Sequence, residues 1–358
     1  MRRPTDSLTP AAMGLLLAIS TTPVHADPEQ TVRLYRTREE QREVGVQRRI
    51  ASWLTSSALA EIEWQAEDFD LREGARGERN RGFDEGLQWG LVATPLAFAQ
   101  IELLLDYDGD AGDAEIDEAL FAVEAGDLEL EIGQLYLPFG AYYSRFVSGP
   151  LVEFGETRAT AAVVSYAPND RVDFSLAAYR GRAREQSSDS GRLDWTFAME
   201  VLPWRTLALG CSVQSDLADA DSRPLADDSN RYSRKVPGVS AYFSWLGEHL
   251  DFSFEVLAAT RSYRELDADR DRPVAWNLEV AYRIVPRFGL ALRLEGSDEL
   301  EDAPHRQYGI AGSWLIHRNA SLTLEYLHGE FAGALAANDR DEIYDAVEHV
   351  GALLSIAY

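Results

Sequence analysis

The chain has 358 residues, 46% of them hydrophobic, a formal net charge of −26 and a single cysteine, Cys211. Nucleic-acid binding is disfavoured, because neutralising phosphates requires clustered Lys and Arg, and one cysteine excludes an intrachain disulfide. No segment reaches the roughly 18 consecutive apolar residues that a transmembrane helix needs.

The first segment has the features of a secretion signal. Arg2 and Arg3 precede a short apolar run at 11–19, and Val24-His25-Ala26 forms a small-residue cleavage motif. We therefore predict a signal peptide over 1–26. Residues 27–52 are crowded with Arg and Glu and contain no Gly before Gly45, which favours a helical periplasmic leader.

From residue 57 onward the chain reads as a series of alternating strands. In the segment 273–284, Trp276, Leu278 and Val280 occupy one face, while Glu279 and Ala281 share the other. The same pattern predicts sixteen strands, near 57–66, 85–94, 96–107, 115–124, 127–137, 157–167, 170–182, 191–201, 204–217, 236–246, 248–264, 273–284, 287–297, 306–317, 319–331 and 346–358.

Tight turns rich in Pro, Gly, Asn and Asp join these segments in pairs, and longer polar loops separate the pairs. The predicted turns lie at 94–95, 125–127, 168–170, 203–204, 246–248, 285–287 and 317–319. An even strand number with short turns on one side and long loops on the other is typical of bacterial outer-membrane barrels.

Periodicity alone does not separate a membrane barrel from a soluble sandwich, whose apolar faces pack against each other. The secretion signal, the strand count and the aromatic strand ends favour the barrel. Tyr358 ends an alternating strand, and this ending resembles the terminal signal that the assembly machinery of outer-membrane barrels reads. We predict an all-β fold over 53–358: a transmembrane antiparallel β-barrel of about sixteen strands in the bacterial outer membrane, with an inward-folded third loop and the short N-terminal helix.

Catalytic signatures are absent from the sequence: we find no nucleophile elbow, P-loop, HExxH or CxxC motif. His305 near Asp302 is the one candidate for a barrel enzyme, and no serine signature accompanies it. We therefore expect neither an enzyme nor a cofactor. A structural or adhesion barrel with a closed lumen remains an alternative.

Acidic runs mark two of the long loops. Asp106, Asp108, Asp110, Asp113 and Asp117 partly imitate a calcium loop, but Ala111 occupies the position of the sharp turn, which requires Gly. These acids, and those of 216–228, are expected to be solvated outer-loop residues. No metal site is predicted, and whether these loops bind divalent cations stays open.

The third long loop, 138–156, differs from its acidic neighbours because it is aromatic and only moderately polar. Pro138 ends a strand and Gly140 permits a sharp turn. Such a composition favours a loop that packs inside the barrel and narrows it. The predicted constriction residues are Tyr136, Pro138, Phe139, Gly140, Tyr142, Tyr143, Arg145, Glu153 and Glu156.

The run from 129 to 182, with the motifs at 133–140 (GQLYLPFG) and 149–157 (GPLVEFGET), resembles the LbtU-type siderophore porin family. More broadly it is similar to sixteen-stranded porins with an inward-folded third loop. The resemblance implies a channel that takes up a ferric siderophore. General, carbohydrate and phosphate-type porins share similar strand–loop junctions and remain alternatives.

The hypothesis from sequence is passive or facilitated diffusion of a small solute through a loop-narrowed lumen. Opposed acidic and basic walls would set a transverse field in the lumen. The wall residues predicted to set this field are Glu102, Arg171, Arg192, Glu279, Arg283, Arg293, Glu295 and Glu325. The expected partners are the solute, outer-membrane lipids and the assembly machinery; association of three barrels stays open.

Overall fold

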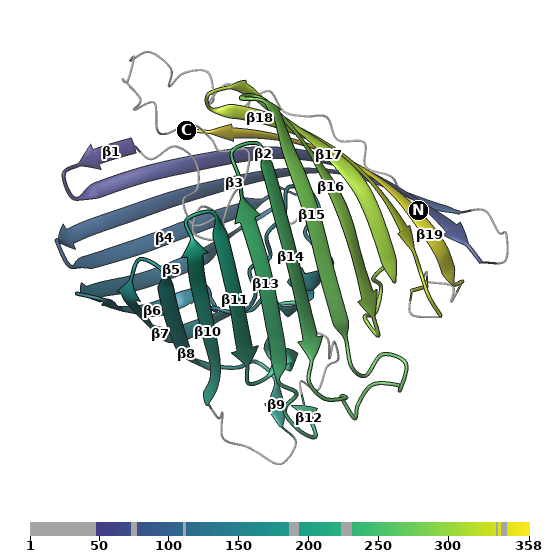
Figure 1. The fold of residues 1–358 in the computed structure, drawn as a ribbon, viewed down its shortest axis with the longest axis horizontal. Coiled ribbons are helices and arrows are strands. Elements are labelled where there is room, and N and C mark those ends of the chain that lie inside the picture. Colours follow the sequence, from purple (N-terminus) through teal and green to yellow (C-terminus); the bar gives the residue numbers. More distant parts are fainter. Residues whose placement is uncertain are drawn as a thin grey trace. The chain divides into compact units, whose positions relative to one another are not determined.

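The computed structural model describes residues 48–72, 77–109, 112–185, 193–222, 231–333, 336–337 and 342–358 (Figure 1). The predicted signal peptide, and residues 27–47 of the predicted leader, lie outside this part of the chain. The elements are β1 (Arg48–Ala51), β2 (Leu54–Leu71), β3 (Glu78–Leu96), β4 (Ala99–Asp108), β5 (Asp113–Ala125), β6 (Leu128–Tyr136), the 3-10 helix η1 (Leu151–Gly155), β7 (Arg158–Asn169), β8 (Val172–Arg180), β9 (Arg184–Glu185), β10 (Leu193–Trp204), β11 (Leu207–Gln214), the 3-10 helix η2 (Leu217–Asp219), β12 (Arg231–Tyr232), β13 (Gly238–Leu246), β14 (Leu250–Ala259), β15 (Val274–Val285), β16 (Phe288–Asp298), β17 (Arg306–His317), β18 (Ala320–Glu330) and β19 (Tyr344–Ala357).

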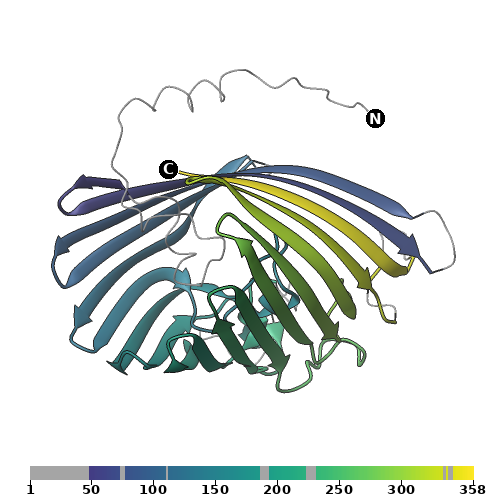
Figure 2. The same ribbon diagram turned by 45° about the horizontal axis from the view of Figure 1, so that its top comes forward.

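All strands except β1, β9 and β12 form one closed antiparallel barrel of sixteen strands, as predicted. Each strand pairs with the next along the chain, and β19 pairs with β2 to close the ring. At the closure, Tyr358 exchanges backbone hydrogen bonds with Ala58, at 2.8 and 2.7 Å. Because a closed barrel has no edge strand, its backbone groups are paired without water. Figure 2 shows the strands curving around the interior.

The alternation of the strands divides the barrel into an apolar outer face and a polar inner face. Trp195 and Trp314 on the outside are 46% and 51% exposed, whereas Glu279 on the inside is fully buried. Large apolar side chains this exposed, on many strands, require a hydrocarbon surround. The soluble sandwich is therefore excluded, and the barrel spans the bacterial outer membrane. The described residues contain no helix that is long and apolar enough to cross a membrane.

Three of the seven predicted turns are displaced toward the C-terminus by one or more residues. Pro95, Pro168 and Pro203 do not sit in the turns but in the last residues of β3, β7 and β10, next to shifts of register. Proline has no N–H to donate to the ladder, so a strand accommodates it where pairing is interrupted. The turns follow at 97–98, 170–171 and 205–206.

The N-terminal helix prediction is wrong for the residues that the structure describes. Residues 48–51 form strand β1, which pairs antiparallel with the start of β2. Arg48 also donates a hydrogen bond from Nη1 to the Tyr358 hydroxyl, at 2.6 Å. The hydrogen bonds that this short segment makes to the barrel, through its backbone and through Arg48, thus stabilise the extended conformation more than the helical one.

Candidate functional site

The third loop of the barrel, residues 137–157, leaves β6 and folds into the interior before it enters β7. It appears in blue-green in the interior of Figure 1, with η1 at its end. Its backbone amides bond to inward-facing side chains of the opposite strands, as described below, which places it inside the barrel. The inward fold agrees with the prediction, and the loop and the walls around it form the candidate site.

The loop begins with a corner built by Pro138, Phe139 and Gly140. Phe139 is fully buried in a hydrophobic cluster that also holds Phe154 and Leu257. Gly140 has a φ of +75°, and a Cβ at this position would lie 2.6 Å from the ring of Tyr142. Glycine is therefore required both by the left-handed backbone and by the aromatic ring that covers it.

Inward-facing carboxylates hold the first half of the loop through its backbone. Glu255 on β14 accepts hydrogen bonds from the amides of Ala141 and Tyr142, both at 2.8 Å. Glu279 on the neighbouring strand β15 accepts one from the amide of Arg145, at 2.9 Å. An irregular segment cannot pair its own N–H groups, so carboxylates that receive them satisfy an otherwise costly burial.

The second half of the loop is held in the same way by the next strands. Glu295 on β16 accepts a hydrogen bond from the amide of Leu151 at 2.7 Å. Glu325 on β18 accepts hydrogen bonds from the amides of Val147, at 2.5 Å, and Ser148, at 3.1 Å. The four glutamates thus form a row along the wall, and the loop follows that row.

Two arginines balance part of this negative charge. Arg145 on the loop lies 3.2 Å from a carboxylate oxygen of Asp251 on β14 and 3.8 Å from one of Glu279. Arg293 on β16 pairs with Glu279 at 2.9 Å and donates to the carbonyl of Ser148, also at 2.9 Å.

The guanidinium of Arg293 also stacks over Phe146 on the loop, with its carbon 4.2 Å from the ring centre. Phe146 packs against a floor of small inward-facing residues, which include Ala281, Ala291 and Ala311. Small side chains on the wall therefore leave space for the loop, and the guanidinium of Arg293 covers the ring of Phe146.

The predicted lumen wall divides into three groups. Glu279, Arg293, Glu295 and Glu325 do point inward, but they are at most 3% exposed because the loop covers them. They hold the loop, so the expectation that they face an open lumen requires correction. Glu102 points inward on β4 and is half-buried.

Of the three remaining wall residues, Arg283 shares the inward face of β15 with Glu279 and Ala281, and the other two are not found on the described part of the wall. Arg171 is exposed in the turn between β7 and β8. Arg283 lies near the end of β15 and donates to the carbonyl of Glu248 at 3.2 Å. Arg192 lies outside the described residues. The basic wall that we expected opposite the acidic one is therefore not found among the residues that the structure describes.

The predicted loop residues also divide between anchors and accessible positions. Phe139, Tyr142 and Arg145 are at most 4% exposed and serve as anchors. The accessible set is half-buried apart from Glu153, which is exposed, and consists of Tyr136, Pro138, Gly140, Tyr143, Glu153 and Glu156.

The wall that faces the third loop is acidic, a feature that the sequence analysis missed. On β2 and β3, Glu63 and Asp84 are cross-strand partners, and they alternate with outward-facing Trp64 and Phe83. The inward acids of strands β2 to β6 include Glu61, Glu63, Glu67, Asp84, Glu102, Asp106, Asp117, Glu118, Glu129 and Glu131.

Basic residues are missing from this wall. Within the described residues, strands β2, β4, β5 and β6 contain no Lys or Arg. The two arginines of β3 lie on the same face as Phe83, which points outward. The bordering cations are His349, which lies between Glu67 and Glu325, and Arg158, which pairs with Glu115 and Asp117. A sequence signal existed, because these predicted strands carry acids but almost no bases.

A cavity of about 540 Å³ lies below the loop, toward the short turns. Its lining includes Tyr143 of the loop, Arg171, Glu200, Tyr242 and Glu255. Tyr242 donates a hydrogen bond to Glu200 at 2.5 Å. The cavity is large enough for several water molecules or a small polar solute.

No family model matches the chain. A UPF0422 protein of Coxiella burnetii (strain RSA 493 / Nine Mile phase I) is 24% identical over 251 residues, covering 63% of this chain and 54% of that protein. The chain thus spans about half the length of the curated relative that it matches.

Solved structures with the same fold include three outer-membrane proteins. The outer membrane channel DcaP of Acinetobacter baumannii is 13% identical, with a TM-score of 0.57 over 88% of this chain and 100% of that one. An anion-selective porin from Comamonas acidovorans is 8% identical, with a TM-score of 0.60 over 85% and 99%. OprB of Pseudomonas putida is 9% identical, with a TM-score of 0.58 over 86% and 94%. At these identities the likeness concerns the fold alone, and the chain has the fold of the bacterial porins.

Proposed function

We propose that this protein is a passive outer-membrane channel whose lumen is bounded by the third loop on one side and the acidic wall on the other. The single observation that carries the proposal is the fastened loop: four wall glutamates receive its amides, so its position in the lumen is fixed. A loop that is fixed in this way narrows the lumen of a barrel, and its side chains do not move in to block it.

The charge of the lumen favours cations. The inward faces of β2 to β6 carry carboxylates and no bases. Arg145 of the loop and Arg293 of the wall already form ion pairs, with Asp251 and Glu279. Uncompensated carboxylates along a low-dielectric wall raise the local concentration of cations and repel anions. The phosphate-type porin is therefore the least favoured of the alternatives.

For the cargo, the resemblance of 129–182 to siderophore porins supports a ferric siderophore. The acidic wall narrows this to ferric chelates that are neutral or positively charged, because an anionic chelate would be repelled. A general porin with a preference for cations is the second candidate, and the absence of basic residues from the acidic wall favours it equally.

Two further assignments belong to the proposal. Tyr358 is the terminal assembly signal: it directly follows β19 at the closure with β2, where its backbone pairs with Ala58. The proposed partners are outer-membrane lipids, the barrel assembly machinery and the solute, and the proposed assembly is a homotrimer.

Planar bilayers test the channel. The purified barrel should conduct with a cation preference that appears as a reversal potential in a KCl gradient; a protein that inserts but carries no current would refute the channel. Uptake of a cationic ferric trihydroxamate, compared between the wild type and a variant lacking 141–154, then tests the cargo. Equal iron uptake by both would favour the general porin.

A further inference from the structure

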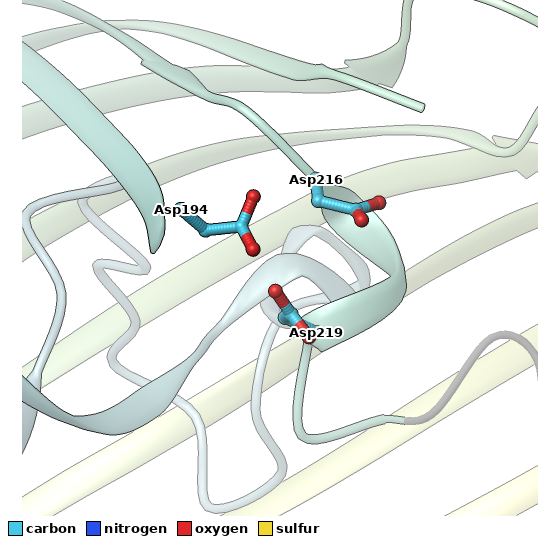
Figure 3. Close-up of side chains that lie close together, drawn as sticks. All are labelled: Asp194, Asp216 and Asp219. Carbon is cyan, nitrogen blue, oxygen red and sulfur yellow. The ribbon is translucent and has the colours of Figure 1, made fainter. Parts of the chain in front are cut away.

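Three aspartates come together above the lumen, where β10 begins and β11 ends. Asp194 lies on β10, Asp216 caps the start of η2, and Asp219 is the last residue of η2 (Figure 3). One carboxylate oxygen of each lies within 4.8 Å of those of the other two. All three residues are at most 3% exposed, so the expectation that the acids of 216–228 are solvated is wrong for Asp216 and Asp219.

The charge of this cluster is only partly balanced. Lys235 forms an ion pair with Asp194, and Ser215 donates a hydrogen bond to the same oxygen at 2.8 Å. Asp216 receives the hydroxyl of Tyr232 and two longer amide contacts, both at 3.3 Å. Three carboxylates facing one ammonium leave two negative charges in a buried place, where charge without a counter-ion is costly.

A buried carboxylate oxygen of the cluster has no hydrogen-bond partner among the described residues. Asp219 uses Oδ1 to accept the amide of Ala183, at 2.8 Å, but its Oδ2 accepts nothing. Tyr263 is 1% exposed, and its hydroxyl also has no partner. Burial, followed by the charges of Asp216 and Asp219, raises the pKa of the Tyr263 phenol.

We propose that Asp194, Asp216 and Asp219 bind a divalent cation, with Ca²⁺ as the best fit. The donors are all oxygen, as hard cations prefer. Ca²⁺ accepts carboxylate oxygens at ~2.3–2.6 Å in flexible geometry, whereas Mg²⁺ demands a near-ideal octahedron and usually keeps several waters. A 2+ ion would neutralise the two unbalanced charges.

Burial raises the pKa of Asp216 to about 6, and burial with the charge of Asp216 raises that of Asp219 to about 7. These directions agree with a cluster that lacks positive charge.

The site would act on the third loop through the segment that follows η2. The amide of Asp221 donates to the carbonyl of Glu156 at 2.7 Å, and its carboxylate accepts the amide of Arg158, also at 2.7 Å. Ser222 donates to the carbonyl of Phe154 at 2.5 Å. An ion that fixes Asp216 and Asp219 therefore also fixes the C-terminal end of the loop.

Calorimetric titration of CaCl₂ into the EDTA-treated barrel in detergent tests the site. We expect one saturable site with a Kd on the order of 10⁻⁴–10⁻³ M, as in extracellular calcium modules. Asp216→Asn with Asp219→Asn should weaken binding at least about tenfold, the loss expected when charged ligands are neutralised. Asp113→Asn, at an exposed acid that begins β5, should bind as the wild type does.

A variant that should bind Ca²⁺ more tightly distinguishes the loss of the site from misfolding of the barrel. Lys235→Met removes the cation that competes for Asp194, so it should tighten Ca²⁺ binding several-fold (about the effect of one added net negative charge). Absence of saturable binding to the wild type, unchanged binding in the double variant, or weaker binding in Lys235→Met would each overturn the proposal.

Discussion

Arg145, in the middle of the third loop, forms an ion pair with Asp251 of β14, with 3.2 Å between Nη2 and Oδ2. The arginine side chain is fully buried and that of Asp251 is 7% exposed. The chain thus places a loop cation against a carboxylate that lies more than a hundred residues away. This contact fixes the middle of the loop to the wall, and the other contacts fix its ends.

Replacement of Arg145 by Met should loosen the loop. The substitution keeps much of the apolar stem but leaves Asp251 and Glu279 without their loop cation, and breaking a buried ion pair costs about 3–5 kcal/mol. Single-channel records should show larger and noisier conductance. Arg287→Met, in an exposed turn between β15 and β16, should behave as the wild type does; identical traces for both variants would mean that the ion pair does not hold the loop.

Replacement of Glu325 by Leu should free the amides of Val147 and Ser148. Hydrogen bonds to a charged acceptor are worth about 1.5–3 kcal/mol each, which corresponds to roughly a 10- to 100-fold loss of protection from exchange. Hydrogen–deuterium exchange of a peptide covering 144–150 measures this. Glu330→Leu, exposed at the end of the same strand, is the control, and equal protection in both variants would argue against carboxylate fastening.

Gly140→Ala should displace the loop corner, because the new Cβ would meet the Tyr142 ring at 2.6 Å. Gly126→Ala is a matched control: its φ of +68° is nearly the same, but no atom lies within 4 Å of the added Cβ. Both substitutions carry the backbone cost of about 1–2 kcal/mol, so the difference isolates the ring contact. Thermal unfolding should be affected in both, while faster exchange of 138–146 should occur in Gly140→Ala alone.

Neutralising the acidic wall should reduce cation selectivity. Glu63→Gln with Asp84→Asn removes two neighbouring carboxylates from a wall without bases, so the reversal potential in a KCl gradient should move toward zero. Asp127→Asn, in a short turn outside the wall, should leave it unchanged. A reversal potential that stays at the wild-type value in the double variant would locate the selectivity elsewhere.

The periodicity of individual strands is local, so much of the barrel was predictable from sequence. Outward Trp276 and Leu278 against inward Glu279 were assigned correctly, because side chains alternate whatever the tertiary context. The corner at Pro138 and Gly140 was predictable for the same reason, since its backbone requirements reside in those residues. The prolines misled the turn positions because Pro95, Pro168 and Pro203 fit both a turn and a strand end with interrupted pairing.

The sequence by itself determined which side chains share a face, that short turns alternate with long loops, and that the third loop differs from its neighbours. Only the closed barrel decided what each inward residue meets. Glu279, Glu295 and Glu325 became partners of loop amides, and Glu63 and Asp84 became an unbalanced wall. Asp216 and Asp219 became buried beside Asp194. The physical reason is that alternation is a property of consecutive residues, whereas burial and charge balance depend on segments that the closure of the ring brings together.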